Sequence, residues 1–181
     1  MNLILCGLPG AGKSTTSRLL AKRLGWPLIE TDELLEQKCG ATCRETHLKI
    51  GENRFREIEF EILQTLSGTH QIIDIGGGML TYPPSAELLR TFGRFIYLQV
   101  DLAVAFERKL RQGMPSFLDP KNPYKSYLKL ALQRELIYER YSNLTIEATA
   151  LSPTAIVESI LDFLSAPQVP LECGGSASAL L

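Results

Sequence analysis

The chain has no long apolar segment and no excess of charge of one sign. Its first apolar residues stop at Gly7 without a preceding basic region, and no later run approaches the ~20 apolar residues of a membrane span. We therefore expect no signal peptide and no membrane contact. The 19 Lys and Arg residues nearly balance 20 Asp and Glu residues, for a net charge of −1. This balance provides no field that would attract nucleic acid.

Cysteine is also scarce, which argues against a metal centre. Four cysteines occur, and none forms a C-x-x-C pair. Cys39, Cys43 and His47 are spaced four apart, as on one helical face, but Gly40 interrupts that helix and zinc would need a fourth ligand. We interpret the cysteines as reduced structural thiols, which are typical of cytoplasmic proteins.

The most specific pattern is the phosphate loop, residues 7–15, which matches G-x-x-x-x-G-K-[ST]. It follows the apolar run Leu3–Cys6, a predicted strand, and precedes a predicted helix, which is the context that this pattern requires. Glycines allow backbone N–H groups to face a phosphate chain, and the helix N-terminus adds partial positive charge. The residues expected to bind ATP are Gly10, Ala11, Gly12, Lys13, Ser14 and Thr15, with Lys13 on the β- and γ-phosphates and Ser14 on Mg²⁺.

Strand and helix patterns alternate along the rest of the chain. Strands are predicted at 3–6, 27–31, 71–75, 94–100 and 144–148, and helices at 14–24, 32–38, 51–66, 84–90, 102–111, 124–141 and 153–164. This order predicts an α/β fold of three layers, with a five-stranded parallel sheet and helices on both faces. We expect one domain over residues 1–166 and a mobile tail over 167–181, which has no periodicity.

Polar and glycine residues follow the second and third predicted strands. Glu30 and Asp32 come at the end of one, and Gly76, Gly77 and Gly78 at the end of the next. Because parallel strands end at one edge of the sheet, these residues should meet the phosphate loop. Paired carboxylates there suit Mg²⁺ and acceptance of an alcohol proton, although Thr31-Asp32 is also a plausible helix cap. Three consecutive residues without side chains indicate close approach by a ligand or another chain segment.

Several segments together resemble the shikimate kinases, a family of P-loop small-molecule kinases, over residues 1–165. They are the phosphate loop, Thr31-Asp32, the G-E-x-x-F-R-x-x-E pattern of 51–59, the glycines 76–78, Arg134-x-x-x-Tyr138 and Ser152-Pro153. The resemblance implies a P-loop kinase fold and ATP-dependent phosphorylation of the 3-hydroxyl of shikimate, a step in aromatic amino acid biosynthesis. It further implies a Mg²⁺ cofactor and a cytoplasmic, monomeric enzyme without nucleic acid or membrane partners.

The resemblance also implies roles for individual residues. Lys13 and Asp32 would be catalytic, with Asp32 orienting the attacking hydroxyl and accepting its proton late. Arg56 and Arg134 would bind the shikimate carboxylate, while Gly76, Gly77 and Gly78 would let the ring lie close. Ser14 and Glu30 would hold the metal, and Arg108 would contact ATP. A substrate-binding segment (32–60) and a lid segment (112–123) complete the expected site.

Several positions depart from the family pattern. Met114 precedes Pro115 where the family places a lid arginine, and Arg111, Lys109 and Lys121 are candidates to supply that charge. Asp74 is an extra carboxylate at a strand end, with a possible place in the magnesium shell. Glu30 replaces an aspartate, and Thr46-His47 replaces an Ile-Phe pair. Two alternatives therefore stay open beside an active shikimate kinase: a nucleotide-binding pseudokinase, and a P-loop kinase for another small molecule.

Overall fold

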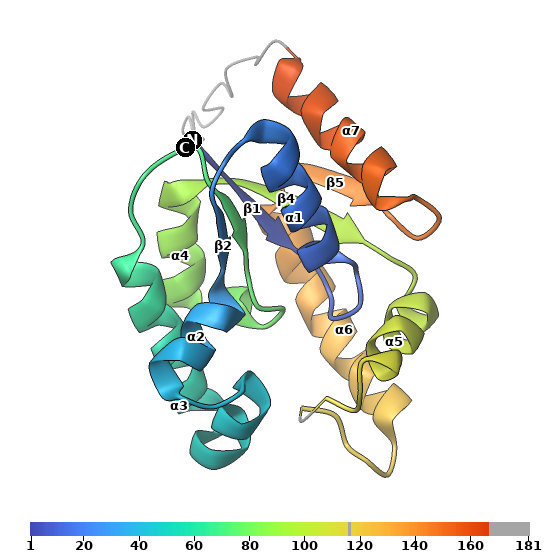
Figure 1. Ribbon diagram of the computed structural model, residues 1–181. Coiled ribbons are helices and arrows are strands. Elements are labelled where there is room, and N and C mark those ends of the chain that lie inside the picture. Colours follow the sequence, from blue (N-terminus) through green and yellow to red (C-terminus); the bar gives the residue numbers. More distant parts are fainter. Residues whose placement is uncertain (116, 167–181) are drawn as a thin grey trace, which may run out of the picture.

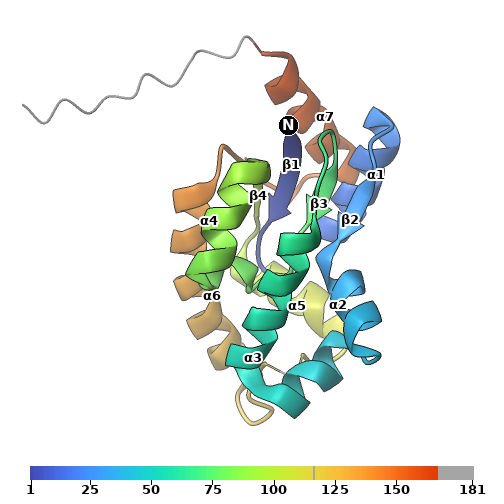
Figure 2. The same cartoon turned by 90° about the vertical axis from the view of Figure 1, so that its left-hand side faces the viewer.

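The computed structural model describes residues 1–115 and 117–166, and in them a parallel sheet lies between two layers of helices (Figures 1 and 2). Its five strands run in the order β2-β3-β1-β4-β5. They are β1 (Asn2–Cys6), β2 (Leu28–Glu30), β3 (Ile72–Asp74), β4 (Gly93–Gln99) and β5 (Leu144–Glu147). The predicted three-layer fold with a five-stranded parallel sheet is confirmed; the predicted tail, 167–181, lies outside the described residues.

The helices cover both faces of the sheet. α1 (Lys13–Leu24) and α7 (Pro153–Ser165) pack together on one face, and α4 (Pro83–Phe92) and α6 (Pro123–Tyr141) lie on the other (Figures 1 and 2). Because β1 is covered on both sides, all its side chains are buried, which explains why its sequence is apolar from Leu3 to Cys6. Within the described residues no helix is long and apolar enough to cross a bilayer.

The predicted helix at 51–66 is the second half of a longer kinked helix, α3 (Cys43–Thr65). Gly51 interrupts it with φ 77° and ψ 170°, a conformation that favours glycine. The first half begins with a capping box in which Thr42 and Glu45 bond to each other's backbone N–H groups. That T-x-x-E pattern is a helix-start signal that the sequence prediction missed.

Gly40 ends α2 (Thr31–Cys39) in the left-handed conformation, with φ 65°. Cys39 therefore lies on α2, whereas Cys43 and His47 lie on α3, and the three do not share one helical face. α2 and the second half of α3 enclose a small apolar cluster of their own, formed by Leu35, Phe55, Ile58 and Ile62. The substrate-binding segment is thus packed separately from the main core around the sheet.

The lid segment joins α5 (Leu102–Arg111) to α6, and both helices were expected. α5 has the predicted bounds, while α6 begins one residue early, at Pro123, because proline is well suited to the first turn of a helix. Ser152 caps α7 by accepting a hydrogen bond from the Ala155 N–H, as predicted. A 3₁₀ turn, Met79–Thr81, follows the glycines 76–78.

Candidate active site

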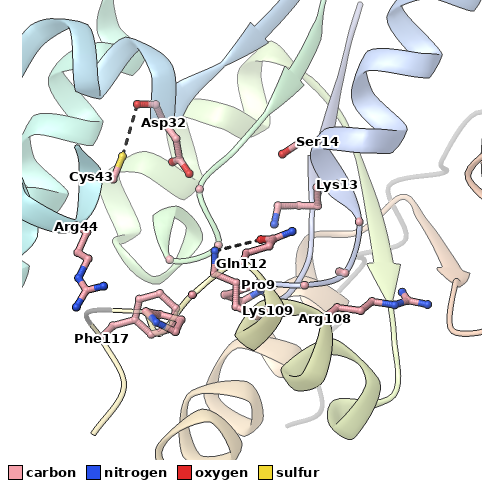
Figure 3. A pocket seen from close by; sticks show the side chains of 18 of the residues that line it. Pro9, Lys13, Ser14, Asp32, Cys43, Arg44, Arg108, Lys109, Gln112 and Phe117 are labelled. Carbon is pink, nitrogen blue, oxygen red and sulfur yellow. Dashed lines mark hydrogen bonds between the residues drawn. The ribbon is translucent and has the colours of Figure 1, made fainter. Parts of the chain in front are cut away.

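A cavity of about 850 Å³ opens at the carboxyl ends of the central strands. It is bordered by the phosphate loop, by α2 and α3, and by the lid segment, and Figure 3 shows its side chains. The predicted site residues that line it are Gly10, Ala11, Gly12, Lys13, Ser14, Thr15, Asp32, Arg56, Gly76, Gly77, Gly78, Arg108 and Arg134. Glu30 is the predicted site residue that is absent from this lining.

The phosphate loop adopts a conformation that only glycine accommodates at its centre. Gly10 has φ 92°, and a Cβ atom there would lie 2.0 Å from the Ala105 carbonyl oxygen of α5. Gly12, with φ 91°, precedes the first turn of α1, and no side chain caps that turn. The Lys13 ammonium group donates to the Gly7 carbonyl, 3.1 Å away, across the loop. The N–H groups of this turn and the Lys13 charge together form a site suited to an anion.

Asp32 lies in the first turn of α2, and its carboxylate enters the cavity near Lys13 (Figure 3). Burial raises the pKa of Asp32, while the positive charges of Lys13, Lys109 and Arg56 oppose that shift. No side chain caps the start of α2, so the alternative that Thr31-Asp32 is a helix cap is wrong. Thr31 instead accepts from the Gly76 N–H at 3.1 Å and donates to the Asp74 carbonyl, which joins α2 to the glycine turn.

The three glycines of 76–78 each make room for a different polar side chain. A Cβ on Gly76 would lie 2.7 Å from the Asp32 carboxylate, and one on Gly78 would lie 2.0 Å from the Arg56 guanidinium. At Gly77 the nearest atom would be an Arg134 nitrogen, 3.2 Å away. The predicted close approach of another chain segment is confirmed, because the glycine turn brings the two arginines and Asp32 around one point.

Arg56 is buried within a group of acidic side chains. Its guanidinium donates to Glu59 at 2.5 Å and to Glu52 at 2.8 Å, and Glu52 also contacts His47 Nε2 at 2.7 Å. Burial raises the pKa of Glu59 to about 7, although the charge of Arg56 opposes the shift. His47 lines the cavity and packs edge-on against Phe55. Arg56 therefore reaches the cavity with its charge already balanced by two carboxylates.

Arg134 is equally buried, at 8% exposure, but has different neighbours. No carboxylate of the described residues forms an ion pair with it, and burial lowers the pKa of its guanidinium. It hydrogen-bonds to Tyr138, whose hydroxyl donates to the Gly77 carbonyl, and it lies 5.8 Å from the centre of the Phe117 ring. A buried cation without a counter-charge favours an anionic ligand in the adjoining cavity.

The two predicted metal ligands have different surroundings. Ser14 lines the cavity, and its hydroxyl interacts with the buried Asp74 carboxylate at the end of β3. Burial raises the pKa of Asp74, and Lys13 and Ser14 counteract this. Glu30 instead forms a two-pronged ion pair with Arg18 of α1, with a shortest distance of 2.8 Å. The carboxylate beside Ser14 therefore belongs to Asp74.

Arg108 marks the end of the cavity that is remote from Asp32. Its guanidinium donates to the Thr149 carbonyl at 3.0 Å, and in Figure 3 it points away from Lys109 and Asp32. Apolar residues from the segment after β5 and from the start of α7 also line the cavity, namely Ala148, Leu151, Pro153 and Ile156. A flat apolar wall beside the phosphate loop has the character of a nucleobase site.

Several cavity residues were not predicted as site residues. Cys43 donates its thiol to the Asp32 carbonyl at 3.5 Å, and Arg44 donates to the Met114 carbonyl of the lid segment at 2.9 Å. Behind the cavity, the buried Tyr127 of α6 donates to the Pro9 carbonyl at 2.8 Å, which fixes α6 against the phosphate loop. Each contact joins positions distant in sequence, so helix periodicity gives no sign of it. For Glu59, the pattern of 51–59 includes the residue but assigns it no role.

Comparison with known proteins places these features in a family. The shikimate kinase family model matches residues 9–165. A shikimate kinase of Corynebacterium jeikeium is 33% identical over 161 residues, which cover 89% of this chain and 86% of that protein. The solved shikimate kinase from Acinetobacter baumannii, in complex with shikimate, is 31% identical with a TM-score of 0.85, over 90% of this chain and 92% of that one. The Aquifex aeolicus enzyme follows at 28% identity and a TM-score of 0.76, covering 91% and 96%.

Proposed function

The chain belongs to the shikimate kinase family, and we propose that its cavity is the site where ATP phosphorylates the 3-hydroxyl of shikimate. The observation that carries this assignment is the buried guanidinium of Arg134, which has no paired carboxylate among the described residues and lines the same cavity as Asp32. Shikimate offers one carboxylate and three hydroxyls, which match a guanidinium and a carboxylate that face the same space. The phosphate loop and the apolar wall near Arg108 accommodate ATP at the other end.

Substrate binding divides between two arginines of unequal character. Arg134 supplies the net positive charge that the shikimate carboxylate neutralises, because no protein carboxylate is paired with it among the described residues. Arg56 is fixed by Glu59 and Glu52, so it contributes directed hydrogen bonds more than free charge. Gly78 allows the Arg56 guanidinium to lie against the backbone of the glycine turn.

In the phosphoryl transfer, the bond between the γ-phosphorus and the β–γ bridging oxygen breaks as the 3-oxygen of shikimate bonds to phosphorus. Asp32 orients the attacking hydroxyl and accepts its proton late in the step, since the transition state is loose. Its buried position raises its pKa, which makes it a better proton acceptor than an exposed aspartate. Lys13 stabilises the negative charge on the phosphates.

The chain also offers groups suited to Mg²⁺. The Ser14 hydroxyl and the Asp74 carboxylate lie together beside Lys13, and oxygen ligands of this kind are those that magnesium prefers. When bound, the ion neutralises charge on the β- and γ-phosphates. We propose Ser14 and Asp74 as the protein groups that hold it; Glu30, the ligand expected from the sequence, stays a prediction and is paired with Arg18. Cytoplasmic location, a monomeric state and the lack of nucleic acid partners likewise stay predictions.

The role of Arg134 can be tested by separating the binding of the two substrates. Arg134→Met should weaken shikimate binding by about 2–4 kcal/mol, because the substrate carboxylate loses its charged partner, and should leave ATP binding nearly unchanged. Calorimetric titration with shikimate and with ATP measures both affinities. Arg140→Met, on an exposed face of the same helix, serves as the matched control. Unchanged shikimate affinity in Arg134→Met would refute the assignment of this end of the cavity.

A further inference from the structure

The lid segment covers part of the cavity without bringing an arginine of its own. Met114 and Pro115 line the cavity, and Met114 stands where the shikimate kinase pattern has a basic residue. Lys121 is the one Lys or Arg within 112–123, and it is absent from the cavity lining. Charge that develops on the transferred phosphoryl group must therefore be stabilised by a cation from another element.

α5 ends with three basic residues, and two of them are held away from the reaction centre. Arg108 bonds to the Thr149 carbonyl at the nucleobase end. Arg111 is paired with Glu107 at 2.7 Å, one helical turn earlier, and its side chain is 73% exposed. Arg111 also lines the cavity, but its charge is paired with Glu107 in solvent, which makes it less suited to the phosphoryl group.

Lys109 is the exception among these three. All three line the cavity, but the Lys109 side chain turns toward the cavity centre whereas that of Arg108 turns the other way (Figure 3). Lys109 interacts electrostatically with Lys13 and with Asp32, the two groups that flank the path of the phosphoryl group. Burial and the neighbouring Lys13 lower its pKa, and Asp32 opposes the shift. Among the described residues, its hydrogen-bond partner is the neutral amide of Gln112, at 3.4 Å, so its charge is available to a ligand.

Arg44 also approaches the lid segment, but at the rim of the cavity. Its guanidinium donates to the backbone carbonyl of Met114 at 2.9 Å and lies on the side of α3, remote from Lys13 in Figure 3. This contact ties the lid segment to the substrate-binding segment. It does not bring the Arg44 charge to the phosphate loop.

We propose that Lys109 is the catalytic cation that takes the place of the missing lid arginine. The inference rests on the function proposed above. During transfer Lys109 keeps its proton and donates hydrogen bonds to the equatorial oxygens of the phosphoryl group, as the bond to the leaving ADP oxygen breaks and the bond to the acceptor oxygen forms. The acceptor proton passes to Asp32. Lys13 and Lys109 then hold the phosphoryl group from two sides.

Lys109→Met keeps the length of the side chain and removes its charge, and Arg111→Met is the matched control. We expect Lys109→Met to lower kcat with shikimate by about tenfold or more while the dissociation constant of shikimate stays within about twofold. Lys109→Arg should restore most of the rate. Arg111→Met should retain the wild-type rate, because that side chain is paired with Glu107 in solvent.

A binding measurement separates this inference from the proposed function. The affinities of ADP and of the non-hydrolysable ATP analogue AMPPNP are measured without shikimate, in wild type and in both variants. The ratio of the AMPPNP affinity to the ADP affinity measures what the γ-phosphate contributes. Lys109→Met should lower this ratio by about fivefold or more, and Arg111→Met should leave it unchanged. A wild type that fails to phosphorylate shikimate would refute the proposed function alone. Wild-type rates and affinity ratios in Lys109→Met would refute the role of Lys109.

Discussion

Asp74 and Glu30 are paired in register at the ends of neighbouring strands, yet their carboxylates differ in their interactions and in their availability to a metal ion. Asp74 is buried and interacts with Ser14, whereas Glu30 is paired with Arg18. The strand-end pattern predicted a carboxylate beside the phosphate loop and selected Glu30, because sequence spacing does not reveal ion pairs with a different helix. The residue beside Ser14 follows from the pairing of β3 with β1, which places Asp74 next to Leu5 and the phosphate loop.

The two carboxylates can be distinguished by metal binding. Asp74→Asn should weaken Mn²⁺ binding to the ADP complex, measured by electron paramagnetic resonance, by about tenfold or more, since a charged ligand is lost. Glu30→Gln is the control and should change the affinity by less than about threefold, because its carboxylate is engaged with Arg18. The opposite order of effects would restore Glu30 as the metal ligand and exclude Asp74.

At the scale of elements, the strands and most helices could be predicted because each is determined by the sequence pattern of its own residues. The run Leu3–Cys6 and the alternation of strands and helices are enough to define the sheet and its layers. The first half of α3 was missed because its apolar periodicity is weak and Gly51 resembles a helix start. Its true start depends on the capping box at Thr42, and its direction depends on the kink.

The kink at Gly51 offers a test of how α3 positions the substrate-binding segment. Gly51→Ala places a Cβ in open space but forces φ 77°, so we expect a loss of about 1–3 kcal/mol in the free energy of unfolding. The KM for shikimate should rise as well, because the half of α3 that carries Cys43 and His47 would reorient. Urea unfolding and steady-state kinetics measure the two effects.

Gly25→Ala is a matched control for backbone strain. Gly25 also has positive φ, at 66°, with open space at its Cβ, but it ends α1 and does not line the cavity. It should lower stability by about 1–2 kcal/mol without altering the KM for shikimate. Equal KM values in the two variants would show that the kink has no part in binding.

For the whole molecule, the residues that line the cavity were easier to predict than the side chains with which they interact. Lys13 and Asp32 follow from the phosphate loop and the strand-end pattern, Arg56 and Arg134 follow from the resemblance to the shikimate kinases, and all four line one cavity. The sequence does not show which of these charged side chains form ion pairs. Arg56 is paired and Arg134 is not, and this difference arises only when α3 and α6 meet at the glycine turn.

The buried Glu59 should make stability depend on pH. Its pKa of about 7 lies above the ordinary value of 4.5, so the native state binds the proton more tightly than the unfolded state does. Its contribution to stability is therefore full below pH 4.5 and is lost as pH rises through 7, by at most about 1.4 kcal/mol per pH unit. We expect the difference in unfolding free energy between wild type and Glu59→Gln to fall from pH 5 to pH 7.5. A constant difference over that range would contradict the raised pKa.

The measurement that tests the central claim most directly is release of ADP from ATP by the wild-type protein with a panel of acceptors. The acceptors are shikimate, gluconate and nucleoside monophosphates, in a coupled assay with Mg²⁺. The account predicts rapid ADP release with shikimate and none above background with the others, because Arg134 and Asp32 match a carboxylate and hydroxyls on one ring. Binding of ATP or shikimate without ADP release would identify a pseudokinase. A higher rate with another acceptor would contradict the assignment of this cavity to shikimate.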